Sequence, residues 1–118
     1  MKLSEIKSLT QSTDFCSSNI LKCILGITDL DVAVFCKIGD GNCDIMEVAE
    51  RVGRDRSSVQ RSLKNLIAVG LISRQSVSMS RGRKYVYSAI TKERLKDILI
   101  SRIEKYCNIL KEQVRVME

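Results

Sequence analysis

The sequence predicts a mainly α-helical protein with one small β-hairpin, and three observations support this fold class. Apolar residues recur every three or four positions over long stretches, which is the helical period. Two runs rich in β-branched, aromatic and serine residues occupy 71–79 and 85–90, with Gly82 between them, as is typical of paired strands. The chain has 118 residues, no proline and only 4% aromatics, so we expect a single domain (1–118) with an aliphatic core.

Positive charge is concentrated in the middle third of the chain. Residues 51–84 contain nine lysines and arginines and one acid, Asp55, for a local net charge of +8, although the whole chain carries +6. Residues 1–50 are net negative, at −4. A basic block can be no more than a solvated face, but this one coincides with a structural unit. We therefore favour an electrostatic surface for nucleic acid.

Three helices are expected in this unit, and each has a cap residue at its start. Thr28 is placed to cap the first helix. Asp44 is placed to cap the second, and Glu47 three residues later completes a capping-box arrangement. Gly53 should end the second helix, and Asp55 should cap the third.

The third helix, at about 56–69, has two distinct faces. At about 100° per residue, its apolar face contains Val59, Leu63, Leu66 and Ile67, and its polar face contains Ser57, Gln60, Arg61 and Lys64. Gly70 is placed to end this helix in a left-handed conformation, with Leu71 folding back on Leu66. Two short helices joined by a three-residue turn with glycine form the helix-turn-helix pattern, whose second helix enters the major groove of DNA.

The predicted hairpin follows directly and would form a wing beside the two helices. Its tip, at about 80–84, reads SRGRK and should be exposed and positive. Such a tip can reach the phosphate backbone or the adjacent minor groove.

These residues resemble a known group of proteins. The run IMEVAERVGRDRSSVQRSLKNLIAVGLISR, with SRGRKYVYSAIT after it, resembles the winged helix-turn-helix transcriptional regulators of archaea and bacteria, especially the MarR-like and TrmB-like groups, and favours an archaeal member. The resemblance covers about residues 28–91. By position it implies base or phosphate contacts from Arg56, Ser57, Ser58, Gln60, Arg61 and Lys64, and backbone contacts from Arg81, Arg83 and Lys84. Longer TrmB-type proteins have a sugar-binding C-terminal domain that this sequence lacks, so we expect no sugar effector.

Helices are also expected on both sides of the core at 28–90. The segment 91–118 is predicted as one helix of about 26 residues, or roughly 39 Å at 1.5 Å per residue. Its apolar stripe could pack on its own domain, but so long a helix would overrun a domain of this size, which favours a two-fold seam. The expected dimer interface is Leu95, Leu99, Ile103, Tyr106, Leu110 and Val114. The segment 14–27 is predicted as an extra N-terminal helix.

The chain has five cysteines and no histidine. No spacing matches a zinc site, and an odd count argues against a disulfide framework, so we expect mostly buried, inert thiols. The alternative is a thiol or metal sensor, because Cys43 precedes a helix N-terminus, where a thiolate is favoured.

The sequence therefore predicts a cytoplasmic, homodimeric winged helix-turn-helix regulator that binds double-stranded DNA. We expect no enzymatic activity, catalytic residue, cofactor, metal or membrane association, and we leave a small-molecule or redox effector open. The competing hypothesis is a winged helix that serves as a protein-interaction module, since a fold does not dictate its function.

Overall fold

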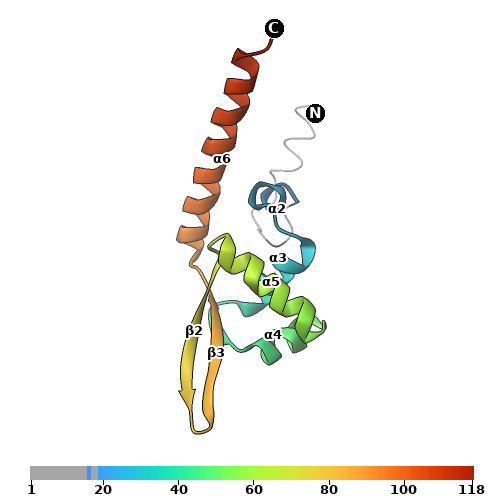
Figure 1. Ribbon diagram of the computed structural model, residues 1–118, viewed down its shortest axis with the longest axis vertical. Coiled ribbons are helices and arrows are strands. Elements are labelled where there is room, and N and C mark those ends of the chain that lie inside the picture. The colour runs from blue at the N-terminus through green and yellow to red at the C-terminus, as the bar shows by residue number, and fades with distance from the viewer. Residues whose placement is uncertain (1–15, 17–18) are drawn as a thin grey trace.

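The computed structural model describes residue 16 and residues 19–118, and its fold is mainly α-helical with a small antiparallel sheet. The molecule is elongated, with extents of 64 × 27 × 26 Å, because the β-hairpin and the last helix project in opposite directions from a cluster of helices (Figure 1). The elements are α2 (Asn19–Leu25), α3 (Asp29–Ile38), β1 (Asn42–Cys43), α4 (Ile45–Val52), α5 (Arg56–Ala68), β2 (Ile72–Met79), β3 (Gly82–Ala89) and α6 (Lys92–Arg115). Among the described residues, no helix is both long and apolar enough to span a bilayer.

The helix starts follow the predicted caps. Thr28 Oγ1 accepts a hydrogen bond from the Asp31 N–H, and the Asp31 carboxylate accepts one from the Thr28 N–H, both at 3.1 Å. This reciprocal pair explains why an aspartate can be almost fully buried at the start of α3. At α4 the Asp44 carboxylate accepts from the Glu47 N–H at 2.9 Å, so Asp44 is the N-cap as predicted.

The end of α5 is also as predicted. Gly70 has a φ of 83°, in the left-handed region that a residue without Cβ enters most easily. The Leu71 N–H donates to the Leu66 carbonyl at 2.9 Å, and the Gly70 N–H donates to the Ile67 carbonyl at 3.0 Å. These two bonds are the Schellman pattern, and they bring the buried Leu71 onto the buried Leu66.

The sheet contains one strand more than the predicted hairpin. Its order is β1-β3-β2, and β1 pairs with β3 through Asn42 with Ser88 and Cys43 with Tyr87. The hairpin tip is shorter than predicted, because Met79 pairs with Gly82 and only residues 80–81 lie in the turn. The prediction that Arg83 and Lys84 belong to the tip is therefore wrong, and both lie within β3.

The core lies where α3, α4 and α5 meet the base of the sheet. It is formed by buried aliphatic residues with Cys43 and Tyr87, and its fully buried members include Val34, Val48, Val59, Leu63, Leu66 and Leu71. Three predicted members of the α5 apolar face are buried, but Ile67 is 37% exposed, which corrects its placement. A position at the edge of the apolar arc can leave the core when nothing packs over it.

Helix α6 has an inner and an outer part. Leu95 and Leu99 are each 8% exposed and belong to the core of their own domain. The prediction that these two residues lie in the dimer interface is therefore wrong. This part of the helix packs on its own domain, which is the alternative that the sequence left open. Farther along, α6 extends beyond the other helices (Figure 1), and its large apolar side chains are exposed.

The cysteines differ from the expectation of mostly buried thiols. A disulfide joins Cys16 to Cys36 of α3, with the two Cα atoms 6.3 Å apart. Of the remaining three, Cys23 and Cys107 are exposed and only Cys43 is buried. The odd count misled the prediction because it excludes pairing of all five cysteines but not of two. Residues 14, 15, 17 and 18 of the predicted N-terminal helix lie outside the described residues, and α2 begins at Asn19.

Candidate nucleic-acid interface

Helix α5 presents a polar face that is held in place by its buried side. Val59, Leu63 and Leu66 anchor the helix in the core. The outward residues Arg56, Ser57, Gln60, Arg61 and Lys64 are all exposed. A helix face fixed by packing and free on its other side is the arrangement that major-groove recognition requires.

Ser58 departs from this group. It is 9% exposed, and its hydroxyl donates to the Asp55 carboxylate at 2.6 Å while its N–H donates to the same carboxylate at 3.0 Å. Hydrogen bonds from the Ser58 hydroxyl and N–H lower the pKa of Asp55, so the cap is ionised at neutral pH. Because its hydroxyl completes the N-cap of α5, we leave Ser58 out of the proposed base contacts.

The cations of the wing have different surroundings. Arg81 lies in the two-residue turn and is exposed. Arg83 on β3 donates from Nε to the Ser76 hydroxyl across the hairpin at 2.9 Å. Lys84 donates to Asp44 at the start of α4, at 3.4 Å. The structure thus places Arg81 at the projecting end and the other two along the body of the wing.

Asp44 is a half-buried cap residue with a cation beside it. The Glu47 N–H is the main cause that lowers its pKa, and Lys84 lowers it further by a hydrogen bond and by charge. The carboxylate therefore stays ionised and keeps Lys84 close to the body of the domain.

One cationic group on this side was missed by the sequence reasoning. Arg74 on β2 lies with its guanidinium carbon 4.2 Å from the centre of the Tyr85 ring, a cation–π contact across the hairpin. Between α5 and β2 there is also a hollow, lined by Lys64, Ile67, Ile72, Ser73 and Arg74. The charge count of residues 51–84 included Arg74, but its position next to α5 depends on the fold.

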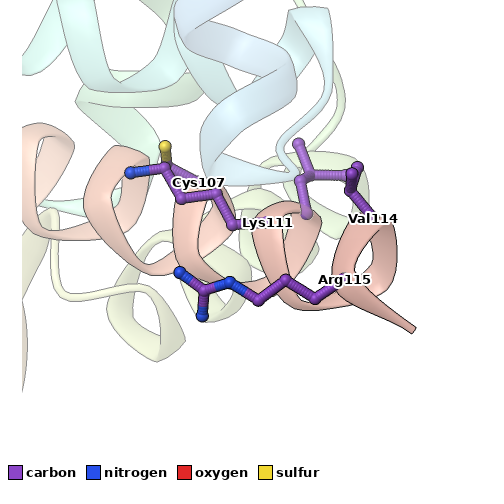
Figure 2. A pocket seen from close by; sticks show the side chains of 5 residues that line it. Cys107, Lys111, Val114 and Arg115 are labelled. Carbon is purple, nitrogen blue, oxygen red and sulfur yellow. The ribbon is translucent and has the colours of Figure 1, made fainter. Parts of the chain in front are cut away.

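The outer part of α6 forms a second candidate surface. Its exposed apolar residues are Ile100, Ile103, Tyr106, Ile109, Leu110 and Val114. A shallow hollow on this part is lined by Cys107, Leu110, Lys111, Val114 and Arg115. Figure 2 labels four of these side chains, Cys107, Lys111, Val114 and Arg115, along the helix. Ile103, Tyr106, Leu110 and Val114 are the members of the predicted interface that remain accessible.

Cys43, the candidate sensor thiol, is buried. Its sulfur accepts a hydrogen bond from Arg51 Nη1 at 3.0 Å and lies 3.9 Å from the Ile38 carbonyl oxygen. Burial shields the sulfur from oxidants, which argues against a sensing role. Among the described residues, no three cysteine, aspartate or glutamate side chains are grouped so that they could hold a metal ion.

Comparisons with known proteins agree with the fold. The family model described as sugar-specific transcriptional regulator TrmB matches residues 21–93. An uncharacterised protein of Methanocaldococcus jannaschii is 36% identical over 118 residues, covering 98% of this chain and 89% of its own. A possible transcriptional regulator from Methanosarcina mazei has a similar structure, with a TM-score of 0.77, 23% identity, and 85% of this chain and 87% of its own covered. A protein assigned to the MarR family in Enterococcus faecalis has a TM-score of 0.55 and 16% identity, with 91% and 98% covered.

Proposed function

The chain belongs to the TrmB family of transcriptional regulators, and we propose that it binds specific sites on duplex DNA as a homodimer. In this proposal α5 enters the major groove and the β2–β3 wing lies along the phosphate backbone. The observation that carries the proposal is that the positive charge lies on the elements that project from the core. The segment 51–84, with a net charge of +8, contains α5, β2 and the start of β3, and these elements project polar side chains from the core.

The roles of the α5 side chains follow from their positions. Arg61 lies near the middle of the outward face, where a guanidinium can pair with guanine through two hydrogen bonds. Ser57, Gln60 and Lys64 lie within one turn of Arg61 on the same face, and Arg56 lies at the helix start. We assign Arg61 and Gln60 to base contacts and the others to bases or phosphates.

The wing supplies the backbone contacts. Arg81 projects farthest, from a two-residue turn, and is the side chain best placed to reach a phosphate beyond the helix. Arg83 and Lys84 lie along the hairpin and can neutralise phosphates after exchanging their partners, Ser76 and Asp44, for DNA oxygens.

The homodimer is supported by the outer part of α6. Soluble monomers rarely expose a contiguous apolar stripe, and here Ile103, Leu110 and Val114 follow one another along one side of the helix. A second copy of the chain has the same stripe on its α6, and pairing of the two helices would bury both stripes. Two α5 helices would then enter major grooves that lie about one helical turn, or a multiple of it, apart.

The competing proposal is that the winged helix binds another protein. An interaction wing would present apolar or mixed surface, whereas the cations of α5 and the wing make this side strongly positive. The charge therefore favours DNA.

The deciding experiment measures binding of the full chain to a pool of random 30-base-pair duplexes by gel retardation and by fluorescence anisotropy. We expect binding that weakens steeply from 50 to 200 mM salt, because phosphate contacts release counterions. Repeated rounds of selection should then enrich sequences with two related half-sites. No retention of duplex DNA at 50 mM salt would contradict the proposal and favour the protein-interaction alternative.

A further inference from the structure

The hollow between α5 and β2 carries an inference that rests on the proposed function and extends it. We propose that this hollow, formed by Lys64, Ile67, Ile72, Ser73 and Arg74, binds a phosphate of the DNA backbone, with Arg74 as its main ligand. Two of the five lining residues are cations and none is acidic. Arg74 is separate from the proposed DNA contacts of α5 and of residues 81–84.

Arg74 is held in position by an aromatic ring. Its guanidinium lies over Tyr85 at 4.2 Å from the ring centre, and the register pairs Arg74 with Tyr87, so Tyr85 is its diagonal neighbour on the same face of the hairpin. Stacking uses the flat face of the guanidinium and leaves the N–H groups in its plane directed outward. A stacked arginine loses less side-chain freedom on binding a phosphate than a mobile one does, so Tyr85 acts as a positioning residue.

The backbone next to Arg74 offers a further donor. β2 is an edge strand, because the sheet order is β1-β3-β2. The Ile90 N–H donates to the Leu71 carbonyl at 3.0 Å, so these two residues form a hydrogen-bonded pair. Hydrogen-bonded pairs recur at every second residue of an antiparallel ladder, and the residues between them, Arg74 among them, direct their N–H groups away from β3. The open edge of β2 therefore adds a backbone N–H, which is a common phosphate donor in DNA complexes.

The remaining lining residues suit a nucleotide rather than a simple ion. Lys64 contributes a second cation from α5, and it lies one turn from Arg61 on the face proposed to enter the major groove. Ile67, exposed to 37%, and Ile72 form an apolar floor that matches the carbon atoms of a deoxyribose beside the phosphate. A DNA strand that passes from α5 to the wing must cross the space between these two elements, and the residues that line the hollow come from α5 and β2.

The first test compares salt dependence among variants of the full chain on random 30-base-pair duplexes. Arg74→Gln should reduce the slope of log K against log salt by about 0.9 for each phosphate that it no longer neutralises, and a symmetric dimer has two such phosphates. Lys105→Gln is the matched control, since Lys105 is an exposed cation on α6, and its slope should equal that of the wild type. Tyr85→Leu should weaken DNA binding. Tyr85→Phe keeps the aromatic ring and should bind DNA as the wild type does. Thermal unfolding of each variant checks that the fold is intact.

The second test locates the phosphate. Neutral methylphosphonates are placed one at a time in a duplex taken from the best-bound sequences of the pool. At one position in each half-site, the methylphosphonate should weaken DNA binding by the wild type and leave DNA binding by Arg74→Gln unchanged. Lys105→Gln should keep the sensitivity of the wild type at that position. If Arg74→Gln keeps the wild-type slope and sensitivity while the wild type binds DNA, this inference is wrong and the proposed function stands. If inorganic phosphate saturates the hollow and the slope of log K against log salt for DNA binding stays unchanged, the hollow is not a DNA contact. That result would also overturn the inference. Failure of the wild type to bind duplex DNA overturns both.

Discussion

Lys84 on β3 and Asp44 at the start of α4 form an ion pair with a distance of 3.4 Å between Nζ and Oδ2, although the two residues are 40 positions apart in the chain. The pair joins the wing to the helix-turn-helix. Asp44 also accepts the Glu47 N–H, so one carboxylate both caps α4 and holds the wing. The two contacts differ in strength, because exposed ion pairs contribute about 0.2–1 kcal/mol and an N-cap contributes about 1 kcal/mol.

The first prediction follows from this difference. Asp44→Ala removes both contacts and should lower the free energy of unfolding by about 1–2 kcal/mol. Lys84→Met removes only the ion pair and should cost less than about 1 kcal/mol. Urea unfolding followed by circular dichroism measures both, and Asp40→Ala, an exposed aspartate after α3, is the control. A loss for Lys84→Met that equals or exceeds the loss for Asp44→Ala would contradict this prediction, because the cap would then contribute nothing measurable.

The second prediction concerns pH. The Glu47 N–H, and then Lys84, lower the pKa of Asp44 below its ordinary value of 3.8. A lowered folded-state pKa contributes stability that is fully present above the unfolded-state pKa and is lost as pH falls through the folded-state pKa. The wild type should therefore lose stability below about pH 4, and Asp44→Asn, which can still cap but cannot titrate, should lose less over that range. Equal losses of unfolding free energy between pH 6 and pH 3 for the two proteins would contradict this prediction.

The local features of the fold could be predicted from the sequence because a few neighbouring residues determine them. Thr28 and Asp55 cap their helices through N–H groups three residues away, and Gly70 ends α5 through its own left-handed φ. The polar face of α5 follows from the helical period in the same way. These parts of the candidate site require no knowledge of distant contacts.

The missed features all depend on contacts between distant segments. β1 is a strand only because β3 lies beside it, and its two residues have no periodicity to detect. The stacking of Arg74 on Tyr85 depends on the hairpin register, and the register differs between the observed turn at 80–81 and the longer predicted tip at 80–84. The exposure of Ile67 depends on how α5 and β2 meet, because this side chain lines the hollow between them.

The third prediction concerns the Cys16–Cys36 disulfide. The bridge closes a loop with a sequence separation of 20, and chain entropy gives such a crosslink about 3 kcal/mol of stabilisation. Cys36→Ser should lower the unfolding free energy by up to this amount, and dithiothreitol should lower the wild type to the same level without affecting the variant. Cys23→Ser, which removes an exposed free thiol, is the control and should resemble the wild type. If the free energy of unfolding of the wild type is unchanged after complete reduction, the crosslink contributes nothing to stability.

The fourth prediction concerns the apolar stripe on the outer part of α6. Leu110→Glu places a charge in the proposed seam. Burial of a leucine contributes about 1.5–3 kcal/mol, and the change occurs twice in a symmetric dimer, so the dissociation constant should rise by at least about 100-fold. Sedimentation at micromolar concentration measures it. Lys105→Glu alters charge on another side of the same helix and should leave the dimer intact. A wild type that sediments as a monomer would contradict the dimer itself.

The last prediction separates base recognition from backbone contact. Arg61 lies at the centre of the α5 outward face, where it can pair with guanine, and its loss should remove sequence information. Arg61→Ala should cost roughly 1–3 kcal/mol on the selected DNA and little on random DNA. Arg81, in the turn of the wing, can mainly neutralise phosphate, so Arg81→Ala should weaken both DNAs nearly equally and reduce the salt slope by about 0.9 per phosphate.

Both variants are measured by salt titration on both DNAs, and each serves as the control for the other because each removes one arginine. Arg83→Ala is the informative third variant, since Arg83 already bonds to Ser76 within the hairpin. Its effect on the salt slope should be smaller than that of Arg81→Ala, because part of its hydrogen-bonding capacity is used inside the wing. If Arg61→Ala weakens both DNAs equally while Arg81→Ala changes sequence preference, the wing reads bases and α5 holds the backbone, which reverses the assigned roles.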